Sequence, residues 1–502
     1  MTRADDAPGA GDEVRQLLRR ALEAYAADAD AVAVLDHLLE RLDAPLQVAL
    51  AGKLKAGKST LLNALLGEEL AATDHAECTR VVTWYRYAAV PSVTVHPVVG
   101  KPWPSPPRRG SSGLEIDLRG VRPEEIDRIE VAWPASGLHS MTLIDTPGLD
   151  SVLHEVSEQT SAFLTATDEE SPVDAVVYLM RHLHATDVRF LETFQHGRAE
   201  RAAAAATIVV LSRADEVGAG RIDAMLSATR VAERYRADPA LRRLCHTVVP
   251  VTGLLAFTGQ TLRAEEYAAL RRLGSLDRAV IEGLLLSVDR FRRPSLMLPV
   301  TAEVRAQLLA RLGLFGVRLS LALLRARDSR ESTLAGELVR RSGLVELQRV
   351  LGTQLMERRD QLRAQAAVLA LARMLEENPP PGPVGDELAA RCEQLTLAAH
   401  ELRELHLLAH VRGAEIDLPG GVRADAERLL GAAGQGPLDR LGLRPDARPA
   451  DVRSAAARAL EQWRARADDP LLDRETRQAC RVLARTCEGL LLEPVSVERE
   501  PA

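Results

Sequence analysis

One stretch organises this sequence: Ala51-Gly52-Lys53-Leu54-Lys55-Ala56-Gly57-Lys58-Ser59-Thr60. It contains the pattern G-x-x-x-x-G-K-S, which forms a phosphate-binding loop when a buried strand precedes it and a helix follows it. Both neighbours are expected here, because Leu46 to Leu50 is an apolar run and Ser59 to Leu66 has the pattern of a helix. The alternative is a chance match of the pattern, which would require neither neighbour.

The residues of this loop have distinct expected roles. Its backbone N–H groups and the positive end of the following helix would surround phosphates. Lys58 would reach the outer phosphates, and the Ser59 hydroxyl would bind Mg²⁺. Three of the four lysines in the chain lie here, among 64 basic residues, which indicates that a compact ammonium is needed. The expected nucleotide contacts are Gly52, Lys53, Leu54, Lys55, Ala56, Gly57, Lys58, Ser59 and Thr60.

The composition indicates a cytoplasmic protein with two or three domains. The chain has 502 residues and a net charge of −7, with acidic and basic residues interspersed, so we expect no nucleic-acid partner. The five cysteines are scattered without metal-ligand spacing, and no signal peptide is expected at the N-terminus. The longest mostly apolar stretch, Leu312 to Leu324, is short for a membrane span and contains Arg318. Any membrane contact is therefore expected to be peripheral.

A second motif, Asp145-Thr146-Pro147-Gly148, follows the expected strand Met141 to Ile144. An aspartate at the carboxyl end of a buried strand can hold Mg²⁺ through water, and the N–H of Gly148 can bind the outermost phosphate. The loop would then sense whether that phosphate is present. The alternative is a simple turn at the end of a strand.

A third motif, Ser212-Arg213-Ala214-Asp215, follows the expected strand Thr207 to Leu211. Guanine presents N1–H and its amino group side by side, and one carboxylate can accept both, so Asp215 is the candidate for base choice. The aliphatic stem of Arg213 would lie over the purine ring. The alternative role for Asp215 is a helix cap. The backbone of Thr252 and Gly253, after a further strand, would contact the guanine oxygen.

Apolar periodicity predicts the remaining organisation. Asp12 to Leu42 predicts two helices, which we expect to pack against helices from the other end of the chain. Val81 to Tyr87 and Ser92 to Val98 alternate like the strands of a hairpin. No strand is expected after Thr258; a helix follows Thr301, and a long one runs from Ser342 to about Leu375. His182 and His184 are expected to be polar loop residues.

With these motifs in this order, the sequence resembles the bacterial dynamin-like proteins, over most of its length. The resemblance implies a GTPase domain with a mixed, mostly parallel sheet and helices on both faces, joined to an elongated all-α bundle, the neck and trunk. The implied domains are residues 1–43 (helices of the neck bundle), 44–258 (GTPase), 259–435 (neck and trunk) and 436–502 (a helical hairpin). It also implies GTP, GDP and Mg²⁺ as ligands and a switch threonine at Thr79. The metal ligands would be Ser59, Thr79 and Asp145, and the catalytic residues Lys55, Lys58, Thr79 and Gly148.

Three departures from the family pattern affect the expected chemistry. Ser212 and Arg213 stand where asparagine and lysine are usual, so affinity for guanine is expected to be weaker. Lys55 stands where eukaryotic dynamins carry a serine that helps to hold a monovalent cation, and its ammonium would replace that cation. Leu149 leaves no water-orienting glutamine after Gly148, so unaided turnover should be slow.

The resemblance further implies self-association through the GTPase faces, or a heterodimer with a related GTPase, and remodelling of anionic membrane at the inner face of the cell membrane. Two bundle turns are candidates for the lipid-facing tip, residues 326–332 and the turn near Pro380, while Leu312 to Val317 is expected to be buried. Two other function classes remain: a nucleotide-switched factor acting on ribosomes or RNA, and a scaffold that binds GTP.

Overall fold

A nine-stranded sheet forms the centre of the part of the chain that the computed structural model describes: residues 10–71, 81–110, 113–147, 173–196, 206–218, 220–326, 330–356, 358–380, 383–398, 400–413, 416 and 418–492. Its strand order is β11-β10-β9-β1-β8-β2-β7-β3-β4. The five strands from β11 to β8 are parallel, and β2 is antiparallel to β8. The strands are β1 (Leu46–Gly52), β2 (Thr83–Tyr87), β3 (Ser92–Pro97), β4 (Trp103–Ser105), β7 (Ile126–Trp133), β8 (Met141–Asp145), β9 (Ala175–Met180), β10 (Thr207–Ser212) and β11 (Thr247–Val251).

The predicted hairpin of residues 81–98 is wrong, although both of its strands exist. β7 lies between β2 and β3: Thr83 pairs with Ile129 in a parallel ladder, and Val93 pairs with Val131 in an antiparallel one. Ile129 and Val131 of β7 are fully buried, so the strand between β2 and β3 contributes to the core of the sheet. Alternation along a strand defines its two faces but not its neighbour.

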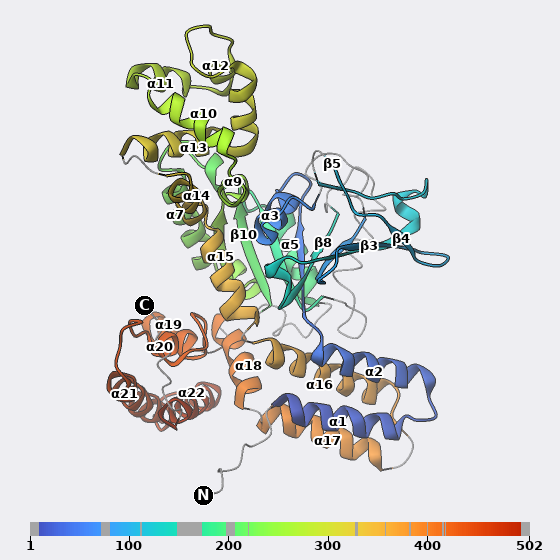
Figure 1. The fold of residues 1–502 in the computed structure, drawn as a ribbon. Helices are drawn as coiled ribbons and strands as arrows, with labels where there is room; N and C mark the ends of the chain where they lie inside the picture. Colours follow the sequence, from blue (N-terminus) through green and yellow to red (C-terminus); the bar gives the residue numbers. More distant parts are fainter. Residues whose placement is uncertain are drawn as a thin grey trace, which may run out of the picture.

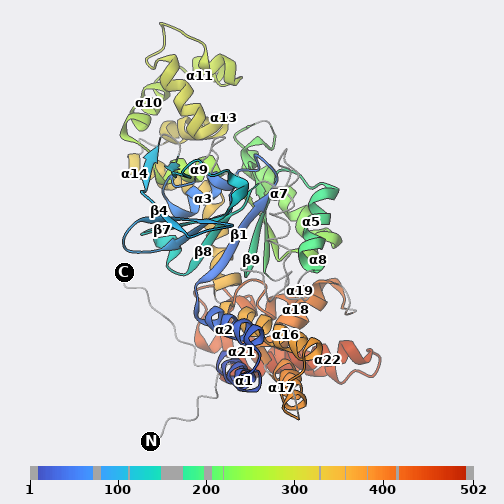
Figure 2. The ribbon, with the colours of Figure 1, turned by 90° about the vertical axis from the view of Figure 1, so that its right-hand side faces the viewer.

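Helices cover both faces of the parallel strands (Figures 1 and 2). On one face, α3 (Lys58–Leu66), α9 (Gly253–Gln260) and α15 (Leu344–Leu351) bury the side chains of alternate strand residues. On the other, α5 (Ala185–His196), α7 (Ala224–Ala237) and α8 (Pro239–Leu244) do the same. The predicted α/β class is therefore confirmed.

A first group of helices lies at one end of the molecule, at the top of Figure 1. It contains α10 (Ala264–Gly274), α11 (Arg278–Leu284), α12 (Val288–Arg292), α13 (Ala302–Ala326) and α14 (Glu331–Arg341) around one apolar core. Leu312, Phe315 and Val317 are buried in this core, as expected. α13 is long and apolar enough to cross a membrane by length and composition, but half of that window is buried within the protein, and Gly313 interrupts its helical backbone.

A second group, at the opposite end, brings together helices that lie more than 300 residues apart in the sequence. α1 (Ala10–Ala24) and α2 (Ala29–Asp43) pack with α16 (Arg359–Glu377) and α17 (Val384–Ala398) around a shared core. The predicted helical bundle is thus present, but the helices of residues 264–341 do not extend it. The long helix predicted from Ser342 is also broken, because the π-helical turn η5 (Gly352–Met356) separates α15 from α16.

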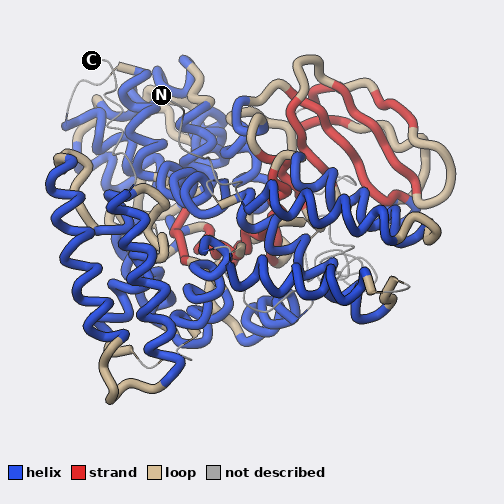
Figure 3. Tube along the Cα trace, turned by 90° about the horizontal axis from the view of Figure 1, so that it is seen from below, coloured by secondary structure: helices blue, strands red, loops and turns tan. Residues whose placement is uncertain are grey.

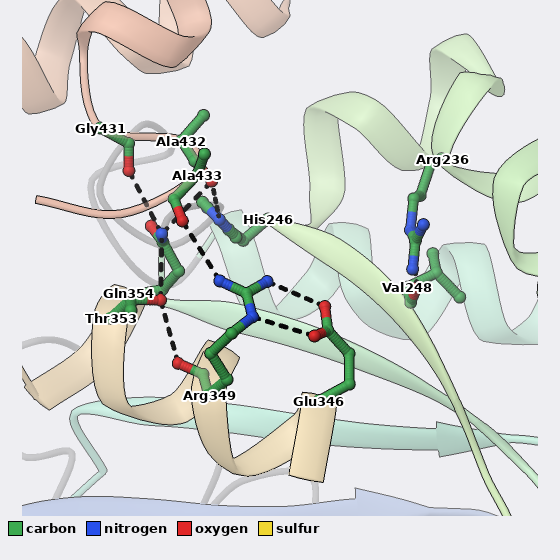
Figure 4. Close-up of polar contacts among 10 residues, drawn as sticks. All are labelled: Arg236, His246, Val248, Glu346, Arg349, Thr353, Gln354, Gly431, Ala432 and Ala433. Atoms are coloured by element: carbon green, nitrogen blue, oxygen red, sulfur yellow. Dashed lines mark hydrogen bonds and ion pairs between the residues drawn. The ribbon is translucent and has the colours of Figure 1, made fainter. Parts of the chain in front are cut away.

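The C-terminal helices pack on one another beside this bundle, and seen from below this end of the molecule is mainly helical (Figure 3). They reach the sheet through a polar contact below β11 (Figure 4). His246 Nε2 lies 3.2 Å from the carbonyl oxygen of Ala432, Gln354 Nε2 donates to the same oxygen at 3.3 Å, and Arg349 donates to that of Ala433 at 3.3 Å. These helices are α18 (His400–Arg412), α19 (Gly420–Leu429), α20 (Pro437–Leu441), α21 (Pro449–Ala467) and α22 (Arg474–Leu492).

Candidate functional site: a nucleotide-binding loop at the end of the parallel strands

The loop between β1 and α3 requires its glycines. Gly52 ends β1 with φ 148°, and a Cβ there would lie 2.5 Å from the carbonyl oxygen of Leu179 in the neighbouring strand. Gly57 caps α3 with φ 96°. Since side chains disfavour both conformations, the spacing of the two glycines fixes the loop over the first turn of α3.

Lys58 turns its ammonium back into this loop. Its Nζ donates to the carbonyl oxygen of Gly52 at 3.1 Å and to that of Lys53 at 3.4 Å. Burial lowers the pKa of Lys58, and the nearby Asp145 carboxylate opposes that shift. A buried ammonium satisfied by two neutral carbonyls can exchange them for charged phosphate oxygens, which form stronger hydrogen bonds.

Ser59 and Asp145 meet beside the lysine. Ser59 Oγ donates to Asp145 Oδ2 at 3.2 Å, while Asp145 Oδ1 is buried without a hydrogen-bond partner among the described residues. Burial raises the pKa of Asp145 to about 6, against the lowering effects of Lys58 and Ser59. A hydroxyl and an under-satisfied carboxylate form a donor set that suits Mg²⁺. Thr79 and Gly148, which were expected to complete the site, lie outside the described residues.

The side chains of the other two lysines of the loop, Lys53 and Lys55, lie in different surroundings. Lys53 Nζ lies 2.6 Å from Thr186 Oγ1 and 3.2 Å from Asp187 Oδ1, both at the start of α5. Its ammonium therefore contacts protein groups, so a contact of Lys53 with nucleotide would come from its backbone. Lys55 has φ 61°, and its side chain is exposed, like that of Leu54.

Asp187 is a residue that the sequence did not reveal. It is buried, and besides Lys53 it accepts hydrogen bonds from Tyr178 Oη at 2.7 Å and from the His184 N–H at 2.9 Å. Among the described residues, no three or more histidines, cysteines and acidic residues gather as a metal cluster, so His182 and His184 belong to no such cluster there.

A cavity of about 140 Å³ joins the phosphate loop to the third motif. The structure thereby brings together segments more than 150 positions apart. Asp215 lines this cavity, and burial raises the pKa of its carboxyl. The other lining residues that were predicted from sequence are Ala56, Gly57, Thr60, Ser212, Arg213 and Gly253.

Ser212 and Arg213, the two positions of the third motif that differ from the family pattern, bind other groups of the protein. Ser212 Oγ donates to the carbonyl oxygen of Met180 at 3.2 Å, so it ties β10 to β9. Arg213 has φ 50° and pairs with Glu216, Nη1 to Oε1, at 2.9 Å, and Arg181 holds the other oxygen of Glu216 at 2.5 Å. The guanidinium of Arg213 is thus fixed at the cavity wall by a residue that the sequence did not single out.

The helical half of the chain also supports the base end of the cavity. The N–H of Thr252 donates to the carbonyl oxygen of Ser342 at 2.8 Å, and Gly343 packs against the backbone of Pro250. A Cβ added to Gly313, at the interruption of α13, would lie 3.5 Å from Asp215 Oδ2. No local pattern could reveal these contacts, because they join segments about 100 residues apart.

Comparisons with known proteins identify a family to which this sequence is similar. The model of the dynamin family matches residues 48–214. The isoniazid-induced protein IniC of Mycobacterium tuberculosis (strain H37Rv) is 42% identical over 489 residues, which cover 96% of this chain and 98% of that protein. A bacterial dynamin-like protein of Nostoc punctiforme is 33% identical over 114 residues, which cover 20% of this chain and 16% of that protein. Among solved structures, an oligomerised bacterial dynamin pair matches with 14% identity and a TM-score of 0.32, covering 96% of this chain and 72% of that chain.

Proposed function

Since this chain belongs to the bacterial dynamin-like GTPases of the IniC type, we propose that it hydrolyses GTP to GDP and phosphate and couples this reaction to self-association and to remodelling of the inner membrane. The observation that carries the proposal is the arrangement along one sheet edge. Lys58, Ser59 and Asp145 lie at the phosphate end, and Asp215 lines the cavity that continues from it.

The residues at the phosphate end of the site are suited to GTP hydrolysis. Ser59 and Asp145 would hold Mg²⁺, with Thr79 as a further ligand, and the metal would neutralise charge on the phosphate oxygens. Lys58 would exchange its loop carbonyls for those oxygens. The Gly148 N–H would bind the outermost phosphate, so that the loop after β8 changes its contacts when that phosphate leaves.

The other end supports recognition of guanine. Asp215 is partly buried at the cavity wall, and pairing its carboxylate with two guanine N–H groups would compensate for its loss of solvation. The backbone of Thr252 and Gly253 would contact the guanine oxygen. Since Ser212 bonds Met180 and does not brace the phosphate loop, affinity should be modest.

Base choice can be tested with a nucleotide that lacks one donor. Inosine triphosphate has N1–H but no amino group, so wild type should turn over GTP more efficiently than ITP, by about tenfold or more in kcat/KM. Asp215→Ala should lose that preference. Asp223→Ala, which removes an exposed aspartate eight residues further on, should keep it.

Self-association and membrane remodelling need a separate measurement. We propose that two copies, or one copy and a related GTPase, meet through their GTPase faces at the cytoplasmic side of the cell membrane, where anionic lipid is present. GTP turnover per molecule should rise with protein concentration and rise again with vesicles containing phosphatidylglycerol. A rate that stays flat in both series contradicts the coupling, and absence of any turnover contradicts the enzymatic proposal itself.

A further inference from the structure

The loop between α12 and α13 leaves two large apolar side chains in solvent. Leu296 is fully exposed and Met297 is 90% exposed. In Figures 1 and 2 this loop projects at the end of the molecule farthest from α1 and α17. Single exposed apolar residues are common, whereas two adjacent and almost fully exposed ones at a projecting loop form a candidate interaction site.

The exposure of this loop is built into the fold. Arg305 of α13 is completely buried, and its guanidinium donates from Nη2 to the carbonyl oxygen of Arg293 at 2.7 Å and from Nε to that of Thr301 at 3.4 Å. One buried side chain therefore ties together both ends of the loop. Phe291 and Val300 anchor the same ends in the apolar core, so the residues between them are directed outward.

The charge around the tip is positive. Arg290, Arg292 and Arg293 are exposed immediately before the loop, and two acidic residues lie near it, Asp289 before the loop and Glu303 after it. Leu471, between α21 and α22, offers a contrast within this chain, because it is equally exposed, at 91%, but lies among three aspartates, Asp468, Asp469 and Asp473. Exposed apolar residues flanked by arginines match a bilayer surface, where apolar groups enter the acyl region and cations meet anionic headgroups.

We propose that residues 294–298 form the lipid-contacting tip of this protein, with Leu296 and Met297 inserted below the headgroups of an anionic bilayer and the three arginines on its phosphates. The proposal rests on the proposed membrane function and assigns its contact site. It differs from both tips suggested by the sequence, residues 326–332 and the turn near Pro380. Residues 327–329 and 381–382 lie outside the described residues, and Pro380 is buried.

The test compares full-length variants by flotation with vesicles of phosphatidylcholine alone or with phosphatidylglycerol. Wild type should bind the anionic vesicles, and Leu296→Asp/Met297→Asp should bind them at least about tenfold more weakly, because two exposed side chains lose their apolar insertion. Leu471→Asp should bind like wild type. Arg292→Glu/Arg293→Glu should weaken binding to the anionic vesicles, whereas Arg444→Glu, an exposed arginine elsewhere, should not.

Insertion itself has an independent readout. Leu296→Trp should show a blue shift with anionic vesicles and quenching by brominated acyl chains, while Leu471→Trp should show neither. The substituted side chains are exposed, so circular dichroism and GTP turnover without lipid should match wild type.

The outcomes separate this inference from the proposed function. If wild type binds vesicles and the Leu296→Asp/Met297→Asp protein binds equally well, the tip assignment is overturned, but the proposed membrane function is not. If this variant instead loses concentration-dependent self-association in sedimentation without lipid, the loop contacts a second copy and the lipid assignment is overturned. If wild type binds no vesicle, both fail, although its GTP turnover still tests the enzymatic proposal.

Discussion

Arg363 of α16 donates from Nη2 to Oδ2 of Asp174, 2.7 Å away, although the two residues are 189 positions apart. Arg41 of α2 binds the other oxygen of this carboxylate at 2.7 Å, and the Gln47 N–H of β1 donates to Oδ2 at 2.8 Å. Both arginines and the aspartate are buried. One carboxylate at the foot of β9 therefore joins the sheet to an N-terminal helix, α2, and to a helix of the second half of the chain, α16.

Asp174→Asn should destabilise the protein by about 3 kcal/mol or more, because it leaves two buried guanidinium groups without their anion. Chemical denaturation at pH 7 would measure this loss. Asp43→Asn is the matched control: its partner Arg15 is half-exposed and the Asp43 side chain is 72% exposed, so the change should stay within about 0.5 kcal/mol. Equal effects of the two variants would contradict a joining role for Asp174.

The stability that Asp174 contributes should depend on pH. Burial raises the pKa of Asp174, but Arg41, Arg363 and the Gln47 N–H lower it further, so the pKa lies below its usual value. A depressed carboxyl pKa adds stability above the unfolded-state pKa, near 4, and that stability is lost as the pH falls through the folded-state value. The difference between wild type and Asp174→Asn should therefore stay nearly constant from pH 7 to about pH 5 and shrink as the pH falls below 4.

Gly343→Ala should destabilise the protein by about 2 kcal/mol or more, since Gly343 has φ 84° and an added Cβ would collide with the carbonyl oxygen of Pro250. Because Ser342 holds the N–H of Thr252, guanine nucleotide affinity should also fall. Gly352→Ala provides the control, since its φ is −57° and nothing lies within 4 Å of the added atom. Thermal unfolding and nucleotide titration would distinguish the two; a neutral Gly343→Ala would refute the close packing.

Asp145→Asn should raise the unfolding temperature of the nucleotide-free protein, because it removes a buried carboxylate that has one oxygen unsatisfied. The same change should abolish the stabilisation that wild type gains from Mg²⁺ together with GDP, and reduce GTP turnover at least tenfold. Scanning calorimetry with and without Mg²⁺ would show both effects. A variant that is still stabilised by Mg²⁺ would remove Asp145 from the metal site.

We propose that the exposed ammonium of Lys55 supplies positive charge near the leaving group. Lys55→Ser should then make hydrolysis slower and dependent on K⁺ or Na⁺, because a hydroxyl can only help to hold a cation. Wild type should retain its rate when these ions are replaced by a bulky organic cation. Equal loss of rate in both proteins would count against the role of Lys55.

Glu404→Gln should destabilise the C-terminal helices by about 2 to 3 kcal/mol at pH 7. Burial raises the pKa of Glu404, but His400, Arg440 and Thr486 overcome this and lower it from 4.5 to about 2. Arg440 Nη2 lies 2.5 Å from Oε2, and Thr486 Oγ1 donates to Oε1 at 2.6 Å. The stabilisation is full above pH 4.5 and declines toward pH 2, so the difference should be smaller at pH 4. Glu488→Gln, at a pair exposed to solvent, should change little.

The sequence alone predicted most of the candidate nucleotide site. The phosphate loop, Asp145 and Asp215 each follow a buried strand, and parallel strands present their carboxyl ends at one edge of a sheet. These signals are local: the two glycines fix backbone conformations of their own segment, and each motif places a side chain at a known end of its strand. The two N-terminal helices and the helical second half were readable for the same reason.

Only the tertiary structure decided which distant segments meet. It placed β7 between β2 and β3, separated the helices of residues 264–341 from the bundle at the opposite end of the molecule, and joined Arg363 to Asp174 and Ser342 to Thr252. It also left Leu296 and Met297 in solvent while burying Leu312 and Phe315, although all four are ordinary apolar residues in the sequence. Periodicity reports which face of an element is apolar, whereas the partner that covers this face, or leaves it bare, depends on packing across the whole chain.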